Sequence, residues 1–156
     1  MVDIKELALL PICNDLTDEE KRYVSPFLKR KEYEADEIVF TQANSGGGKL
    51  YLILEGELKV SRAITKGKEH TLDILKEGQF FGSISVIDSG KHTATVKTTK
   101  DTVLYTITKA NLDNIAVDNP QIGLKFLFPI VHSLAGFLRA MDEKFIETVK
   151  FVTAGK

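Results

Sequence analysis

The sequence has a single cysteine and no surplus of charge of either sign. One cysteine, Cys13, excludes a disulfide within the chain and fits a reducing compartment. Lys and Arg number 21 and Asp and Glu number 22, which gives a net charge of −1. Bulk charge therefore does not attract nucleic acid or an anionic membrane. The length of 156 residues predicts one domain over 1–156.

The sequence also lacks a signal peptide and an uninterrupted apolar run long enough to span a membrane. Acidic and basic residues among the first ten positions break the apolar core that a signal peptide needs. The apolar stretch 124–138 is interrupted by Lys125, Pro129 and His132, and it is shorter than the ~20 residues of a spanning helix. We therefore expect a cytoplasmic protein that does not associate with a membrane.

No spacing typical of a metal site is present. His70, His92 and His132 are far apart, and no two of them have the i, i+4 or CxxC-like spacing of a ligand set. A cupin-like metal enzyme would need two or three histidines clustered with a carboxylate. We expect no metal site, no catalytic residue and no required cofactor, and hence no enzyme.

Two short motifs also fail as catalytic or phosphate-binding signatures. Ser83 follows Gly82, but a nucleophile elbow has glycine two places on either side of the serine. The glycine-rich segment 43–50 has Ala43 and Leu50 where a phosphate loop has glycine and Ser or Thr. We interpret this segment as a flexible turn between strands.

The apolar pattern predicts short helices over residues 1–30. Apolar residues recur at helical spacing over 4–10, and Pro11 ends that helix. Thr17 and Glu20 form a capping box, which begins a helix that should reach about Leu28.

Residues 31–107 are rich in short apolar or alternating runs separated by glycine turns. The runs are Ile38–Phe40, Leu50–Leu54, Leu58–Val60, Thr71–Leu75, Thr93–Lys97 and Thr102–Ile107. Nothing between them is long enough for the crossover helix of a parallel sheet. The pattern predicts a mainly β fold, an antiparallel β-roll (jelly roll) of about eight strands with flanking helices.

Residues 108–156 are predicted to be helical. A short helix covers 109–117, and Asn119 and Pro120 begin a long helix that reaches about Val152. Pro129 removes a backbone donor, so we expect a kink or a split there. An apolar seam repeats along the long helix at Leu127, Val131, Leu134, Leu138, Met141, Phe145, Thr148 and Val152, and an adjacent face carries Phe126, Ile130 and Phe137. We expect one stripe to pack on the β-roll and the other to form a homodimer.

The segment 78–96 reads GQFFGSISVIDSGKHTATV. From Phe81 to Val96 it resembles, without a gap, the phosphate-binding cassette of the cyclic-nucleotide-binding domain family, of the catabolite activator protein and kinase regulatory subunit type. Other segments are similar to that family's entry helix (7–18), first strand (36–40), strand–Gly–Glu turn (52–58) and C-terminal hinge-and-dimer helix (from 120). The resemblance covers nearly the whole chain and implies the same β-roll.

The resemblance implies that cAMP or cGMP binds to the cassette Gly82–Ala94. The implied contact residues are Gly82, Ser83, Ile84, Ser85, Lys91, His92, Thr93 and Ala94. Ser83 stands where the family has a glutamate for the ribose 2′-hydroxyl, and His92 stands where it has the arginine for the cyclic phosphate. Thr93 is a possible guanine contact, since the family places a threonine there in domains that prefer cGMP.

Histidine at position 92 predicts weaker binding than arginine would give. Imidazole lacks the guanidinium fork, and with a pKa of about 6.5 it is mostly neutral at pH 7. Losing one charge-assisted pair costs about 1.5–3 kcal/mol. Lys91 is the adjacent residue that supplies a positive charge in its place. We expect binding to be tighter at pH 6, where His92 is protonated, than at pH 8.

Two functions remain open at this point. In the first, the chain is a free-standing sensor that binds a cyclic nucleotide and signals through its C-terminal helix. In the second, a degenerate roll binds no nucleotide and serves as a dimeric scaffold or adaptor for an unknown protein partner. In that case Phe80, Phe81, Ile84 and Val86 would be core residues only. The sequence ends shortly after the long helix, so we expect no DNA-binding domain and no direct DNA binding.

Overall fold

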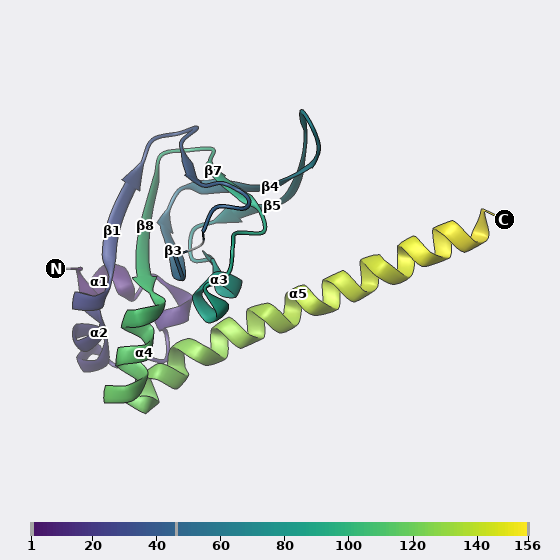
Figure 1. Ribbon diagram of the computed structural model, residues 1–156. Coiled ribbons are helices and arrows are strands. Elements are labelled where there is room, and N and C mark those ends of the chain that lie inside the picture. The colour runs from purple at the N-terminus through teal and green to yellow at the C-terminus, as the bar shows by residue number, and fades with distance from the viewer. Residues whose placement is uncertain (1, 46, 156) are drawn as a thin grey trace.

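The computed structural model describes residues 2–45 and 47–155 as a β-roll with helices at one end and a long helix that projects away from it (Figure 1). The strands are β1 (Lys29–Tyr33), β2 (Ile38–Phe40), β3 (Lys49–Glu55), β4 (Glu57–Thr65), β5 (Lys68–Lys76), β6 (Phe80–Phe81), β7 (Thr95–Thr98) and β8 (Thr102–Thr108). They form two four-stranded antiparallel sheets, in the orders β1-β8-β3-β6 and β2-β7-β4-β5. The predicted antiparallel roll is confirmed.

Two strands were not among the predicted runs. The sequence of β1 is KRKEY, and four of its five residues are exposed, so it carries no apolar alternation. It forms because β8 offers it an edge, with Lys29 opposite Thr106 and Tyr33 opposite Thr102. The other strand, β6, has two residues and pairs with β3. The β-roll therefore begins at Lys29, slightly before the predicted boundary at residue 31.

The N-terminal region consists of α1 (Ile4–Leu7), the 3-10 turn η1 (Pro11–Cys13), α2 (Asp18–Val24) and the 3-10 turn η2 (Ser25–Phe27). The capping box is confirmed: the Glu20 N–H donates to Thr17 Oγ1 at 3.2 Å, and the Thr17 N–H donates to Glu20 Oε2 at 2.7 Å.

Both N-terminal helices are shorter than predicted, and proline explains each difference. Pro26 has no N–H to continue the α-helical ladder, so α2 ends at Val24 and the chain turns more tightly before Leu28. Leu10 precedes Pro11 and is extended, with φ −94° and ψ 114°, because a residue before proline is disfavoured in the α conformation.

The core has two parts. The larger part lies between the N-terminal helices, one sheet and the start of the long helix, and it includes Leu7, Val24, Tyr105 and Phe126. The smaller part lies between the sheets and consists of Tyr51, Ile53, Leu58, Leu75, Phe81, Val96 and Leu104. Both clusters adjoin the predicted cassette, because Val86 belongs to the larger part and Phe81 to the smaller one.

The C-terminal region consists of α4 (Lys109–Asp118) and α5 (Pro120–Ala154). Gly123 lets the two helices cross closely, because a Cβ there would lie 2.8 Å from the Cβ of Ala116. The 35 residues of α5 form one uninterrupted helix, so a split at Pro129 is not found. The proline removes only one hydrogen bond, and Phe126 and Ile130 on either side of it are buried against the roll.

Only the first part of α5 packs on the roll. Ile122, Phe126 and Ile130 are buried, whereas every residue from 135 to 155 is exposed. Phe137, which the sequence places on the same helix face as Phe126 and Ile130, is 53% exposed because it lies beyond the last buried turn. Figure 1 shows this part of α5 extending past the roll. Its seam residues are therefore available for a partner.

The apolar character of α5 has a second consequence. An 18-residue window of the helix has a mean hydropathy of 1.4, so by length and composition alone it could cross a membrane. One such helix is weak evidence for membrane insertion, because helices of soluble proteins meet the same criterion.

Candidate functional site

The predicted cassette folds as β6, a tight turn at Gly82, the short helix α3 (Ser83–Asp88) and a loop that leads into β7. Gly82 has a φ of +90°, and a Cβ there would overlap the carbonyl oxygen of Lys49. Only glycine suits this combination of left-handed backbone and close contact. The Val86 N–H then donates to the Gly82 carbonyl at 3.0 Å and closes the first turn of α3.

The helix α3 has one buried and one exposed face. Ser83, Ser85 and Val86 are buried, whereas Ile84 and Ile87 are each 45% exposed. Ile84 is therefore not the core residue that the scaffold interpretation expected. The helix contacts α5, so the cassette lies next to the helix expected to signal (Figure 1).

The second half of the cassette has one buried member between two exposed ones. Lys91 and Thr93 are exposed, whereas His92 is only 8% exposed. The His92 N–H donates to the Asn44 carbonyl at 3.0 Å, and the Ala43 N–H donates to the His92 carbonyl at 2.9 Å. These two bonds fix the backbone of His92 and direct its side chain into the roll. The last predicted residue, Ala94, is buried.

The imidazole of His92 stacks on the ring of Phe40. The two ring centroids are 3.5 Å apart and the planes differ by 7°. Burial lowers the pKa of His92 from its ordinary value, because the charged form loses its hydration. His92 therefore becomes protonated at a lower pH than an exposed histidine, and the expected gain in ligand affinity on protonation shifts to lower pH as well.

His92 and Phe40 belong to a cluster of four rings completed by Tyr51 and Phe81. Tyr51 and Phe81 stack at 4.7 Å with planes 4° apart, and Phe40 lies 5.5 Å from Tyr51 and 5.9 Å from Phe81. Burial raises the pKa of Tyr51. Sequence reasoning did not assign Phe40 and Tyr51 to the site, because they come from different strands and no local motif relates them to His92.

The two halves of the cassette meet the same loop. Ser45 forms an isolated bridge with Lys91. A Cβ on Gly48 would lie 3.0 Å from Ser89 Oγ and 3.4 Å from the Ser85 carbonyl oxygen. The segment interpreted from the sequence as a flexible turn thus contacts both ends of the cassette at its described residues.

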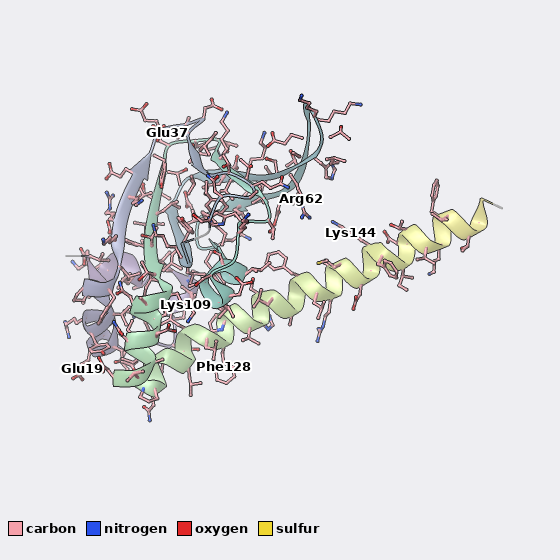
Figure 2. All side chains as sticks on the ribbon, viewed as in Figure 1. Glu19, Glu37, Arg62, Lys109, Phe128 and Lys144 are labelled. Atoms are coloured by element: carbon pink, nitrogen blue, oxygen red, sulfur yellow. The ribbon has the colours of Figure 1, made fainter. Side chains whose placement is uncertain are left out.

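The surface has two hollows besides the cassette loop. A groove of about 790 Å³ adjoins the start of the cassette and is lined by η1, by residues 78–80 and by α5 around Phe128, which Figure 2 labels. A pocket of about 540 Å³ lies beside α1 and Tyr105. Neither is lined by a predicted site residue. Within 2–45 and 47–155, no group of three or more His, Cys, Asp or Glu side chains could hold a metal ion.

Comparison with known sequences identifies relatives over most of the chain. The family model described as "Cyclic nucleotide-binding domain" matches residues 30–119. The cyclic AMP receptor protein of Thermus thermophilus is 28% identical over 128 residues, which are 82% of this chain and 55% of that protein. A cAMP-dependent protein kinase regulatory subunit of Mycosarcoma maydis is 29% identical over 92 residues, 59% of this chain and 17% of that protein. The chain spans about half or less of the length of these relatives.

Comparison with solved structures gives the same result for the fold. A cyclic nucleotide-binding domain from Methylobacillus flagellatus has a TM-score of 0.81 at 23% identity, covering 93% of this chain and 83% of that one. The catabolite activator protein of Thermus thermophilus has a TM-score of 0.75 at 26% identity, covering 86% of this chain and 61% of that one. The predicted architecture is shared with both.

Proposed function

Because the chain belongs to the cyclic nucleotide-binding domain family, we propose that it binds cAMP or cGMP on the cassette Gly82–Ala94 and acts as a regulatory module, not as an enzyme. The relatives support this proposal, since they are named as a cyclic AMP receptor and a kinase regulatory subunit. The proposed setting is the cytoplasm.

The observation that carries the proposal is the backbone of the cassette. Gly82 keeps the left-handed turn that glycine alone accommodates, and the short α3 follows it directly. Lys91 is exposed in the loop that follows α3 and would provide positive charge for a phosphate. A ribose hydroxyl or a phosphate oxygen would meet Ser83 and Lys91 in place of the usual glutamate and arginine. Binding should therefore be weaker than in a domain that has the arginine.

Signalling is proposed to pass through α5. The helix contacts α3, so a ligand that moves α3 changes the packing of the buried turns around Phe126 and Ile130. If α5 has two packing arrangements on the roll, a ligand shifts the equilibrium between them only by its difference in affinity for the two. We further propose that the exposed seam of α5 pairs with a second copy of the chain.

A titration of the wild-type chain with cAMP and cGMP tests the proposal. The expected result is saturable binding of at least one of them, with 5′-AMP, which has an open phosphate, bound more weakly. Absence of binding to both cyclic nucleotides would contradict the proposed function.

The alternative is a dimeric scaffold or adaptor that has lost the nucleotide. The stack of His92 on Phe40 favours it, because this pair occupies the interior beside the cassette with the protein's own rings. The same titration distinguishes the two functions, since a scaffold of this kind would dimerise without binding either nucleotide.

A further inference from the structure

The groove beside the start of the cassette is mainly apolar. Its apolar side chains come from η1, from β6 and from one side of α5, namely Pro11, Ile12, Phe80, Phe128, Val131 and Ala135. Phe128 and Val131 are exposed to solvent, and Figure 2 shows Phe128 where α5 passes the roll. With a volume of about 790 Å³, the groove has room for several large side chains.

The far end of α5 has an exposed apolar face. Phe145, Ile146, Val149 and Val152 are exposed and lie on one side of the helix, at the spacing i, i+1, i+4 and i+7. Val131 and Val149 are about five turns apart, so they belong to the same face of α5. Along this uninterrupted helix the two valines are also about 27 Å apart. The far end of α5 therefore reaches such a groove only in another molecule.

The charges on α5 favour an antiparallel arrangement of two copies. Residues 120–141 carry Lys125 and Arg139 and no acidic side chain. Residues 142–154 carry three acidic residues and two lysines, namely Asp142, Glu143, Glu147, Lys144 and Lys150. An antiparallel pair brings the basic half of each helix to the acidic residues of the other, and the two helix dipoles then attract each other. A parallel pair in register places Arg139 level with Arg139 and Asp142 level with Asp142.

A further pair of charges relates the groove to the far end of the helix. Asp15 lines the groove and is exposed, and Lys150 is exposed next to Val149. Within residues 2–45 and 47–155, neither of the two forms an ion pair. When Val149 of one copy packs on Val131 of another, Lys150 comes to the groove that Asp15 lines, so the two charges attract each other.

We propose that a second copy of the chain docks antiparallel along α5, with residues 145–152 of each copy in the groove of the other. This inference rests on the dimer of the proposed function and adds its orientation and its second contact surface. Because residues 78–80 line the groove, the α5 of one copy contacts the start of the cassette of the other. A ligand that moves the cassette then acts on the dimer contact directly.

Engineered cysteines distinguish the two orientations. Burial raises the pKa of Cys13 to about 12, so its own thiol does not compete. A chain with both Val131→Cys and Val149→Cys should form covalent dimers under mild oxidation, seen by non-reducing electrophoresis. Either single variant should not, because in an antiparallel pair each position is about 27 Å along the axis from its counterpart. Ala140→Cys, on the opposite side of the helix, is the control for random collision.

The results separate the orientation from the dimer itself. A parallel pair would cross-link each single variant to itself, which would overturn the antiparallel arrangement and leave the dimer in place. No cross-link in the double variant would overturn the docking in the groove. A wild type that binds cAMP as a monomer would overturn this inference and leave the function of the cassette intact.

A charge reversal tests the contact in the groove. Asp15→Lys should weaken dimerisation about 3-fold in sedimentation, because the new lysine meets Lys150 of the second copy, and adding Lys150→Glu should restore it. Glu19→Lys makes the same change on α2, outside the groove (Figure 2), and should leave dimerisation unchanged. Equal effects of Asp15→Lys and Glu19→Lys, or no recovery with Lys150→Glu, would overturn the proposed contact.

Discussion

His92 and Phe40 face each other inside the roll, with ring centroids 3.5 Å apart and planes 7° from parallel. Family resemblance assigns His92 to the position of a phosphate-binding arginine. In this chain the side chain is only 8% exposed and covers an aromatic ring. Burial lowers the pKa of His92, and its side chain is already engaged in a contact of its own.

The turn at Gly82 should be essential for the cassette. In Gly82→Ala, the added Cβ meets the Lys49 carbonyl and the backbone must hold a φ of +90°. We expect a loss of about 1–3 kcal/mol in the free energy of unfolding, measured with urea, together with loss of nucleotide binding. Gly67→Ala is the control, since Gly67 has a φ of +83° with nothing within 4 Å of its Cβ position. Equal losses for the two variants would mean that the contact with Lys49 is unimportant.

Stability should depend on pH through His92. Burial lowers its pKa in the folded state, whereas the unfolded chain has the ordinary value of about 6.5. Between these two values the unfolded state binds a proton that the folded state does not, so stability falls as the pH falls below about 6.5. Urea unfolding of the wild type and of His92→Gln from pH 8 to pH 5 measures this. As the pH falls, the free energy of unfolding of the wild type should decrease more than that of His92→Gln. Parallel pH dependence in the two proteins would contradict the role of His92.

The proposed dimer should depend on the seam of α5. Leu138 is 62% exposed, so Leu138→Glu should leave the roll intact and place a charge where apolar contact is expected. The wild type should sediment as a dimer at tens of micromolar and the variant as a monomer, with equal circular dichroism. Ala140→Glu adds the same charge outside the seam and should stay dimeric. A monomeric wild type would contradict the dimer, and one that also floats with lipid vesicles would favour membrane association.

Ligand binding should slow amide exchange at the end of α5. Residues 145–152 are exposed and have no contact with the roll to protect their amides beyond the helix itself. If the bound nucleotide favours a state in which this segment packs on the ligand or on a partner helix, amide exchange of residues 145–152 slows at saturating cAMP. Pro129→Ala restores a backbone donor in α5, between the cassette contact and residues 145–152. This variant should show a smaller slowing of amide exchange on ligand binding. Unchanged exchange over 145–152 would mean that α5 does not carry the signal.

The sequence was sufficient to locate the strands with apolar or alternating runs and the cassette turn. Runs such as Leu50–Leu54 bury their apolar side chains whatever their partners are, so pattern alone locates them. Gly82 lies in a motif whose local backbone is fixed by its own residues. The highly charged β1 could not be located in this way, because its pairing with β8 decides its structure.

Only some of the residues of the site could be predicted from the sequence. His92 was identified by its place in the cassette, but its contact with Phe40 depends on how two distant segments meet. The end of α2 could have been predicted, because Pro26 is visible in the sequence and explains why α2 ends at Val24. The ring cluster could not, because no spacing along the sequence indicates that these four rings meet.

The most direct test of the account is a calorimetric titration of the wild type, His92→Arg and His70→Arg with cAMP at pH 8. His70 is exposed on β5, so its variant has the same added charge away from the cassette. The account predicts measurable binding by the wild type, binding tighter by about 10-fold or more for His92→Arg, as expected for one charge-assisted contact, and no gain for His70→Arg. The absence of binding by both the wild type and His92→Arg would contradict it.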